Sequence, residues 1–415
     1  ANGLIENNSG RLGKELWTDG HDGEAISLYT AYNEYDEAQF VLARIHDWIA
    51  QGGRRSDVAI LYRSNAQSRV FEEALIQAEM PYRVYGGLRF FERAEIKDAL
   101  AYLRLINHRG DDAAFDRVVN VPTRGIGNTT VDKIREFARA NKLTLWDASV
   151  RLAQEGLSSR AANALGAFLK LINQLHEDTA DLALSDQVLH VVEHSGLFAH
   201  YEKDKGEKGQ ARVENLEELA SAARGFETAD DQLSEDDLPP LTAFVTHAAL
   251  EAGEGQAGEW EDCVQLMTLH SAKGLEFPVV FLVGMEQGLF PHQRSIEDAE
   301  GMEEERRLCY VGMTRAMQRL YLCHAESRRL HGQQNLTSPS RFLAEIPRDC
   351  IHEVRPKIQV ERPLFHAPRG GGNFQTTEAD GLKLGQRVLH KKFGEGVVLS
   401  FEGEGARARI QVNFD

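Results

Sequence analysis

The sequence contains little cysteine, with four residues of this type among 415. They are Cys263, Cys309, Cys323 and Cys350, and no two of them form a C-x-x-C pair. A zinc site or a small disulfide-bonded scaffold usually needs closely spaced cysteines. We therefore expect a protein of a reduced, cytoplasmic compartment, without structural zinc and with no metal ligands assigned in this chain.

Long apolar runs are also missing. No run approaches the roughly 20 residues that an α-helix needs to cross a bilayer. The opening residues, ANGLIENNSGRLGKELW, lack the basic, apolar and small-residue order of a signal peptide. We expect no contact with a membrane. The hydrophobic fraction of 42% is ordinary for a globular protein, and the chain length indicates roughly two to four domains.

A surplus of positive charge, the usual mark of nucleic-acid binding, is absent as well. The formal net charge is −17, from 64 acidic and 47 basic residues, which taken alone argues against a nucleic-acid partner. The charge is unevenly spread, however. Glu227–Asp237 and Glu297–Glu305 are acidic runs, whereas Arg306–His331 contains six arginines and one acidic residue. Because local basic surfaces decide phosphate binding, a nucleic-acid site stays open.

Strand and helix patterns alternate up to about residue 90 and again after Cys263. Strands are expected at 24–29, 58–62, 264–269, 278–283 and 320–322, and helices at 35–51, 70–78 and 303–317. This order predicts an α/β fold with a parallel sheet, whose ligand sites lie at the carboxyl ends of the strands.

Between these two parts the pattern changes to helices. Apolar residues recur at helical spacing in Leu100–Ile106, Thr130–Ala140, Leu165–Leu175, Ser185–His194, Val213–Ala223 and Leu241–Leu250. We therefore expect an all-helical domain inserted between two parts of one sheet. Further on, Gln333–Ser340 is expected to form turns and Arg348–Gly381 a flexible linker. Leu382–Phe414 contains three strand-like segments.

Three residues stand near the ends of expected elements: His270 after a strand, Glu276 before a strand, and Arg315 late in the expected helix 303–317. Taken singly, each is usually a solvated charge or a hydrogen-bonded structural residue. Their surroundings are more specific, with TLHSAKGLEF at Thr268–Phe277 and EERRLCYVGMTRA at Glu304–Ala316. These segments resemble motifs V and VI of the UvrD/Rep/PcrA-type superfamily 1 DNA helicases, in the same order along the chain.

The resemblance implies a RecA-like second motor domain and an ATP-dependent 3′-to-5′ DNA helicase that uses ATP and Mg²⁺. Such a protein translocates on single-stranded DNA and unwinds duplexes in nucleotide excision or mismatch repair, in the bacterial cytoplasm at the nucleoid. Arg315 corresponds to the family's arginine finger, whose planar fork suits the γ-phosphate. Gly274 and Glu276 would belong to the same ATP site.

The resemblance also implies contacts with single-stranded and junction DNA. The segment RSNAQSR borders the single-strand track in the family, so Arg63, Asn65 and Arg69 are expected to contact the strand together with His270. A polar helix cap at the same place is the alternative. His331 stands where the family's β-hairpin often carries an aromatic wedge, and a histidine offers less stacking area there.

A glycine-containing turn, Gly125-Ile126-Gly127, precedes a helical run. Backbone N–H groups at such a helix start donate hydrogen bonds to phosphate without reading a base. The turn resembles the helix-hairpin-helix-like element of the family's inserted domain, which implies that Arg124, Gly125, Gly127 and Thr129 contact duplex DNA. The alternative is an ordinary helix-capping turn.

A nucleotide-binding P-loop, G-x-x-x-x-G-K-[ST], is absent from the sequence. We therefore expect the N-terminal motor domain of the same parent chain to complete the ATP site, and this chain alone to hydrolyse ATP no faster than background. The expected limits are 1–90 and 261–348 for the second motor domain, 91–260 for the inserted duplex-binding domain, 349–380 for the linker and 381–415 for an incomplete Tudor-like barrel. Such a barrel would contact RNA polymerase or DNA repair proteins.

Two other interpretations stay open. One is a non-catalytic DNA-binding or regulatory protein with a degenerate helicase domain, and the other is a helicase–nuclease subunit. The intact Lys273-Gly274, Glu276 and Arg315 argue against degeneration. A following cluster of nuclease-like carboxylates and lysine is not found in the sequence, which argues against the second.

Overall fold

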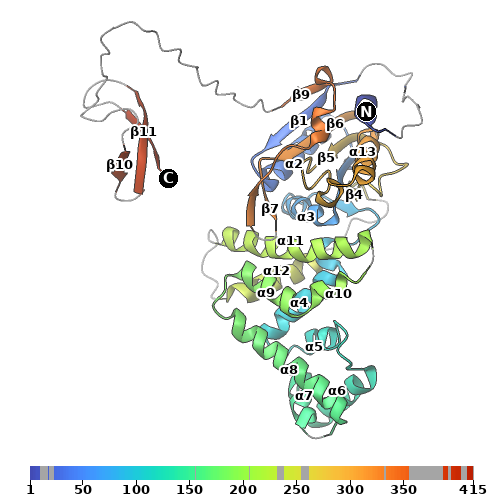
Figure 1. The fold of residues 1–415 in the computed structure, drawn as a ribbon, viewed down its shortest axis with the longest axis vertical. Helices are drawn as coiled ribbons and strands as arrows, with labels where there is room; N and C mark the ends of the chain where they lie inside the picture. Colours follow the sequence, from blue (N-terminus) through green and yellow to red (C-terminus); the bar gives the residue numbers. More distant parts are fainter. Residues whose placement is uncertain are drawn as a thin grey trace. The chain divides into compact units, whose positions relative to one another are not determined.

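The computed structural model describes residues 1–9, 17, 23–154, 156–204, 206–230, 238–253, 261–330, 333–354, 387–390, 394–402 and 409–414. The chain divides into two compact units, Ala1–Pro356 and Lys357–Asp415. The first unit holds a parallel sheet and a large group of helices, and the second holds a small antiparallel sheet (Figure 1).

A seven-stranded sheet forms one core of the first unit. Its strands are β1 (Ile26–Ala31), β2 (Val58–Tyr62), β3 (Tyr82–Val84), β4 (Val264–Thr268), β5 (Phe277–Leu282), β6 (Ala316–Ala325) and β9 (Ile351–Glu353). Their order is β3-β4-β2-β5-β6-β1-β9, and each neighbouring pair is parallel. The α/β prediction is confirmed, and the sheet is consistent with a RecA-like domain.

Helices cover both faces of this sheet because its central strands are apolar on both sides. In β2, Ile60 packs with α2 and α3 on one face, and Leu61 packs with α1, α13 and α14 on the other. These helices are α1 (Asn2–Ile5), α2 (Glu34–Ala50), α3 (Ser68–Gln77), α13 (Ala299–Met313) and α14 (Arg341–Ala344). Ile60 is fully buried, so we expect Ile60→Ala to cost about 2–5 kcal/mol.

A group of helices lies between β3 and β4 along the chain and has a core of its own. Its members are α4 (Ala94–Asn107), α5 (Asp112–Val118), α6 (Asn128–Asn141), α7 (Leu145–Gln154), α8 (Ser159–Thr179), α9 (Leu184–His194), α10 (Leu197–Tyr201), α11 (Glu207–Asp230) and α12 (Pro240–Gly253). Phe115 and Phe168 pack edge to face in this core, with ring centroids 5.7 Å apart. The six expected helical segments each fall within one of these helices.

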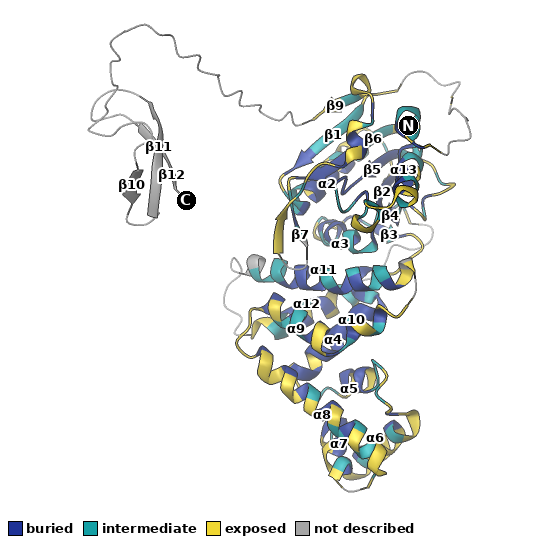
Figure 2. Ribbon diagram, in the orientation of Figure 1, coloured by how far each residue is buried: buried dark blue, intermediate teal, exposed yellow. Residues whose placement is uncertain are grey.

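The helical group belongs to the same compact unit as the sheet, so the domain limits at 91 and 260 stay predictions. Its inner helix faces are buried and the outer turns of α6, α7 and α8 are exposed (Figure 2). Within the described residues, no helix combines the length and apolar composition needed to cross a bilayer.

A β-hairpin follows β6 and is formed by β7 (Ser327–Leu330) and β8 (Gln333–Leu336). Its base is fixed by the buried Arg328, whose Nη2 atom lies 2.6 Å from carboxylate oxygens of Glu37 and Glu286. His331, the wedge candidate, lies outside the described residues.

In the second unit, β10 (Arg387–His390), β11 (Gly394–Glu402) and β12 (Arg409–Phe414) form an antiparallel sheet. Its Tudor-like identity stays a prediction.

Two expected element assignments were wrong. The helix expected at 303–317 ends at Met313, because Ala316 already pairs with Phe277 in the sheet. Arg315 therefore lies in the turn after α13 and not inside a helix. The expected turns after Gln333 begin with strand β8, whose residues are all exposed and so show no apolar alternation. The stretch expected as a linker from 349 includes strand β9 (Ile351–Glu353), which extends the sheet beside β1, and the linker limits stay a prediction.

Candidate functional site

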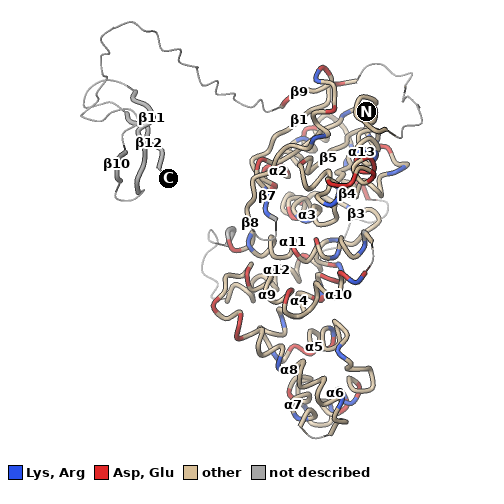
Figure 3. Tube along the Cα trace, in the orientation of Figure 1, with Lys and Arg blue, Asp and Glu red and all other residues tan. Residues whose placement is uncertain are grey.

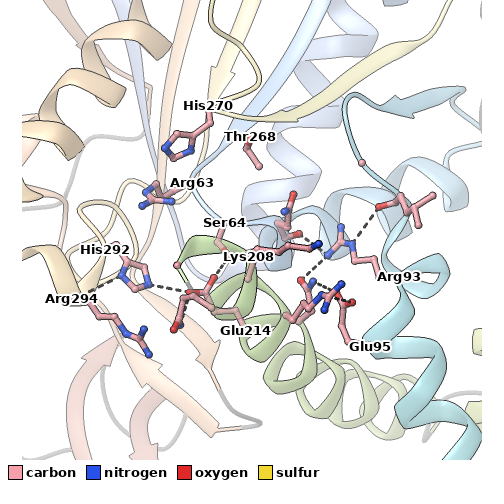
Figure 4. A pocket seen from close by; sticks show the side chains of 18 of the residues that line it. Arg63, Ser64, Arg93, Glu95, Lys208, Glu214, Thr268, His270, His292 and Arg294 are labelled. Atoms are coloured by element: carbon pink, nitrogen blue, oxygen red, sulfur yellow. Dashed lines mark hydrogen bonds and ion pairs between the residues drawn. The ribbon is translucent and has the colours of Figure 1, made fainter. Parts of the chain in front are cut away.

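A cavity of about 760 Å³ opens where the carboxyl ends of β2 and β4 face helix α11. Arg63 follows β2, and His270 follows β4; both side chains lie at this cavity (Figure 4). The cationic side chains that line it are Arg63, Arg93, Lys208, Arg212 and Arg294, against the two carboxylates Glu95 and Glu214. In a chain with a net charge of −17, five cations against two carboxylates make this lining more basic than the chain as a whole.

Arg63 is held in a fixed orientation by a buried carboxylate. Its Nε atom donates to both oxygens of Glu305, at 2.8 and 3.1 Å, and its Nη2 atom lies 2.7 Å from Oε1. The Glu305 residue is 2% exposed, and its Oε2 also accepts from the backbone N–H of His292 at 3.0 Å. This two-point contact sets the guanidinium plane more strictly than a single bond would.

The polar segment after β2 serves two purposes. Ser64 caps the short 3-10 helix η2 (Asn65–Gln67), and the Gln67 side chain accepts from the backbone N–H groups of Arg63 and Ser64. The helix-cap alternative therefore describes Ser64 correctly. Asn65 nevertheless lines the cavity, as His270 does. Local capping thus keeps the segment rigid while part of it faces the cavity.

Arg69 is placed differently from the other expected single-strand contacts. It is 2% exposed, and its guanidinium donates to Glu218 on α11 and Glu73 on α3, at 2.6 Å each. Burial alone would lower the pKa of Arg69, but the two carboxylates outweigh it and hold the pKa well above its usual range. This arrangement favours a role in joining α3 to α11, and a DNA contact of Arg69 stays a prediction.

Glu214 forms a second contact between α11 and the sheet part. Its carboxylate accepts from the Ser64 hydroxyl, from Gln210 at 2.9 Å and from His292 at 3.2 Å. Burial would raise the pKa of Glu214, but these donors outweigh it and the pKa lies below its ordinary value. Glu214 therefore stays ionised at neutral pH beside the cationic cavity.

Sequence reasoning missed part of this cavity. Lys208 and Arg212 stand one helical turn apart on α11, which brings both to one face. Their spacing was a usable signal, but nothing local says that α11 folds back against the end of β2. Arg93 was also missed, and it is largely engaged: it donates to Asn215 at 2.8 Å and to Ser68 at 2.7 Å.

The three residues expected at the ATP site do come together. Arg315 donates through Nη1 to the carbonyl of Leu275 at 2.7 Å, which places it beside the loop that carries Gly274 and the exposed Glu276. Gly274 has a φ of +87°, and a Cβ added there would meet no described atom within 4 Å. A positive φ favours glycine, and the open space leaves room for a ligand to approach.

These residues fit one wall of a nucleotide site. They offer an arginine fork, an open glycine and an exposed carboxylate, but the described residues contain no group of three or more His, Cys, Asp or Glu that could hold a metal ion. A D-E-x-Q segment, the pattern expected to position Mg²⁺ and water in motors of the resembled family, occurs at Asp36–Gln39, but its Glu37 is fully buried and paired with Arg328. That segment of α2 therefore offers no cage for Mg²⁺.

The Gly125 turn precedes α6, in the part of the first unit that lies away from the sheet (Figure 1). Gly125 has a φ of +80°, and an added Cβ at either Gly125 or Gly127 would meet no described atom within 4 Å. Thr129 lies in the first turn of α6, and among the described residues no side chain caps the N-terminus of this helix. The turn is therefore open enough to be approached, as the duplex prediction requires.

Arg124 does not share that openness. Its guanidinium donates to the carbonyls of Ser195 at 2.8 Å, Pro122 at 3.0 Å and Val118 at 3.3 Å. It also lies over the rings of Tyr102 and Phe168, at 5.6 and 5.5 Å from their centroids. These contacts favour a structural role, so the expected phosphate contact of Arg124 stays a prediction.

Comparison with known proteins identifies the family. Residues 1–327 match the model of the UvrD-like helicase C-terminal domain. DNA helicase II of Escherichia coli (strain K12) is 59% identical over 415 residues, which cover 100% of this chain and 57% of that protein. The ATP-dependent DNA helicase PcrA of Bacillus subtilis is 42% identical over 436 residues, covering 100% and 58%. The chain thus spans somewhat more than half the length of these relatives, and it belongs to the UvrD-like helicase C-terminal domain family.

Proposed function

We propose that this chain forms the second motor domain and C-terminal part of an ATP-dependent DNA helicase. The similarity of the chain to DNA helicase II and PcrA supports its assignment to this class of protein. The observation that carries the proposal is the cationic cavity at the ends of β2 and β4, where Arg63, His270 and Lys208 converge from three segments of the chain.

The cavity would hold the backbone of single-stranded DNA. Guanidinium and ammonium groups neutralise phosphates without reading bases, so binding would be weak in sequence preference and strongly salt-dependent. Arg63, Asn65 and His270 would contact the strand from the sheet, and Lys208 and Arg212 from α11. Glu214 would limit the net attraction, which suits a site that releases the strand in every cycle.

The nucleotide would lie against the loop Gly274–Glu276 and Arg315. Bound ATP supplies the phosphoryl group, and the fixed fork of Arg315 would neutralise charge that spreads over its oxygens. Mg²⁺ and the remaining phosphate contacts would come from an N-terminal motor domain of the same parent chain. Closure of the two motor domains on ATP, and opening afterwards, would move the protein 3′ to 5′ along the strand.

The other parts would assist unwinding. The helical group α4–α12 would be the inserted domain that holds duplex DNA through the Gly125 turn, and His331 would stand at the strand junction. The sheet of β10–β12 would belong to a Tudor-like domain that contacts RNA polymerase or DNA repair proteins. Nucleotide excision and mismatch repair are the processes in which such a helicase would act.

The experiment is DNA-stimulated ATP hydrolysis by the full-length protein, meaning this chain together with the N-terminal motor domain proposed above. We expect oligothymidine to raise the hydrolysis rate at least tenfold and a 3′-tailed duplex to be unwound. A full-length protein that binds oligothymidine but hydrolyses ATP at background rate would instead support a non-catalytic DNA-binding role.

A further inference from the structure

Helix α13 connects the two halves of the candidate site. Glu305, in its N-terminal half, holds Arg63 at the cavity, and Arg315 follows its C-terminal end at the loop Gly274–Glu276. The helical part of this connection, from Glu305 to Met313, corresponds to about 12 Å along the helix axis, and Arg315 lies two residues beyond it. Helix α13 thus carries the carboxylate that holds the side chain expected on DNA, and it ends two residues before the arginine that contacts the loop expected on the nucleotide.

The N-terminal contact is rigid. Both carboxylate oxygens of Glu305 are occupied, by the Arg63 guanidinium and by the His292 backbone N–H, and the residue is 2% exposed. The neighbouring Glu304 differs sharply, because its side chain is 61% exposed and pairs with Arg307 on the same helix. Acidic residues gather on this half of α13 (Figure 3), but Glu305 is the one that reaches the cavity wall.

The body of the helix is packed against the sheet. Leu308, Cys309 and Met313 are buried in the core shared with β5 and Leu61 of β2. Packed helices move as units and do not deform continuously. A displacement at the Arg315 end therefore carries Glu305 with it.

The C-terminal contact can respond to a ligand. The Arg315 guanidinium rests on the carbonyls of Val311 and Leu275 and on the Thr314 hydroxyl, at 3.0, 2.7 and 3.0 Å. These are neutral acceptors, and a phosphate is a stronger partner for the same N–H groups because it is charged. An exchange of partners at this point changes what holds the end of α13.

We propose that Glu305 is a positioning residue that links nucleotide binding at Arg315 to the orientation of Arg63 on DNA, with α13 as the rigid connection. The inference rests on the proposed function, because it assigns DNA to the cavity and nucleotide to the loop. It differs from two simpler roles of Glu305: a static support for Arg63, and a competitor that occupies Arg63 in place of phosphate.

The test compares Glu305→Gln with Glu304→Gln in the full-length protein. The dissociation constant for oligothymidine is measured by fluorescence anisotropy, with and without a non-hydrolysable ATP analogue. In the wild type we expect the analogue to change this constant by at least fivefold, a usual size for coupled sites. Glu305→Gln should weaken binding about 3- to 10-fold without nucleotide and reduce the effect of the analogue to less than twofold. Glu304→Gln, the matched control, should change neither quantity.

Two further variants test whether Glu305 acts by positioning Arg63. Glu305→Asp keeps the charge and should restore part of the nucleotide effect, which separates positioning from a general loss of stability. In the double variant Arg63→Gln with Glu305→Gln, binding should be no weaker than in Arg63→Gln alone, because Glu305 acts through Arg63.

Several results would overturn the inference. Weaker binding with an unchanged nucleotide effect would leave Glu305 as a static support, and tighter binding would make it a competitor of DNA. A wild type that binds oligothymidine and hydrolyses ATP but shows no nucleotide effect would also remove the link. These outcomes differ from failure of the proposed function, in which the wild type would bind no single strand or hydrolyse no ATP.

Discussion

The cavity beside β2 and the Gly125 turn use arginine in opposite ways. At the cavity, Arg63 is held by a carboxylate and still lines an open space. Lys208, on a helix far along the sequence, lines the same space. At the turn, the Arg124 guanidinium donates hydrogen bonds to three backbone carbonyls and lies over two aromatic rings. An arginine in a plausible motif is therefore no proof of a phosphate contact, since the acceptors around it decide whether its donors remain available.

The largest expected effect is on ATP hydrolysis, and it distinguishes the role of Arg315 at the nucleotide site from that of the residues that line the cavity. In the full-length protein, Arg315→Ala should lower kcat for ATP hydrolysis about 10³-fold, as loss of an arginine finger does. Oligothymidine binding without nucleotide should change less than twofold, because Arg315 lies outside the cavity lining. Arg315→Lys should not restore the rate, because a point charge replaces a planar fork. Steady-state kinetics and anisotropy check both, and a normal kcat in Arg315→Ala would remove its assignment as the finger.

The next effect concerns stability at the turn. Arg124→Ala removes charged donors from three carbonyls, so we expect a loss of about 2–3 kcal/mol in the free energy of unfolding. Chemical denaturation measures it, with the exposed Arg135 as the matched control. If Arg124 also binds duplex phosphate, the salt dependence of junction binding should flatten by about one ion. A variant with full stability and a flatter salt dependence would reverse our interpretation of its contacts.

The smallest effect tests whether the open part of the turn holds duplex DNA. Gly127→Ala adds a methyl group where no described atom lies within 4 Å, and its φ of −79° suits alanine. The fold should therefore survive, while backbone approach by a phosphate is blocked. We expect binding to a single-strand/double-strand junction to weaken about threefold, which is about 0.65 kcal/mol, and binding to single strands to stay level. Equal binding of both DNA forms would leave the turn as a helix start only. Gly125→Ala is a poorer test, because a φ of +80° makes any side chain strained there.

The same comparison explains what could be predicted from sequence. Strands β2 and β5 and the helices α4, α6, α8, α9, α11 and α12 were predictable because burial on one or both faces leaves a periodic apolar pattern. The end of α13 was missed because Ala316 and Met317 have no strand pattern of their own, although β6 begins at Ala316, which pairs with Phe277 of β5. Arg63 and His270 were found through motifs. Lys208, Arg212 and the bond between Arg63 and Glu305 depend on contacts between distant segments, which no local pattern specifies.

The central claim is that the cavity at the ends of β2 and β4 holds single-stranded DNA. Its most direct test is the affinity of the full-length protein for oligothymidine across a range of salt concentrations, for the wild type, Arg63→Ala, Lys208→Ala and the control Arg135→Ala. Arg135 is an exposed arginine on α6 paired with Asp116 and Asp132. We predict that Arg63→Ala and Lys208→Ala each lower the affinity about tenfold, or 1.4 kcal/mol, and reduce the salt slope by about one ion, while Arg135→Ala matches the wild type. Wild-type affinity and slope in both cavity variants would contradict the account.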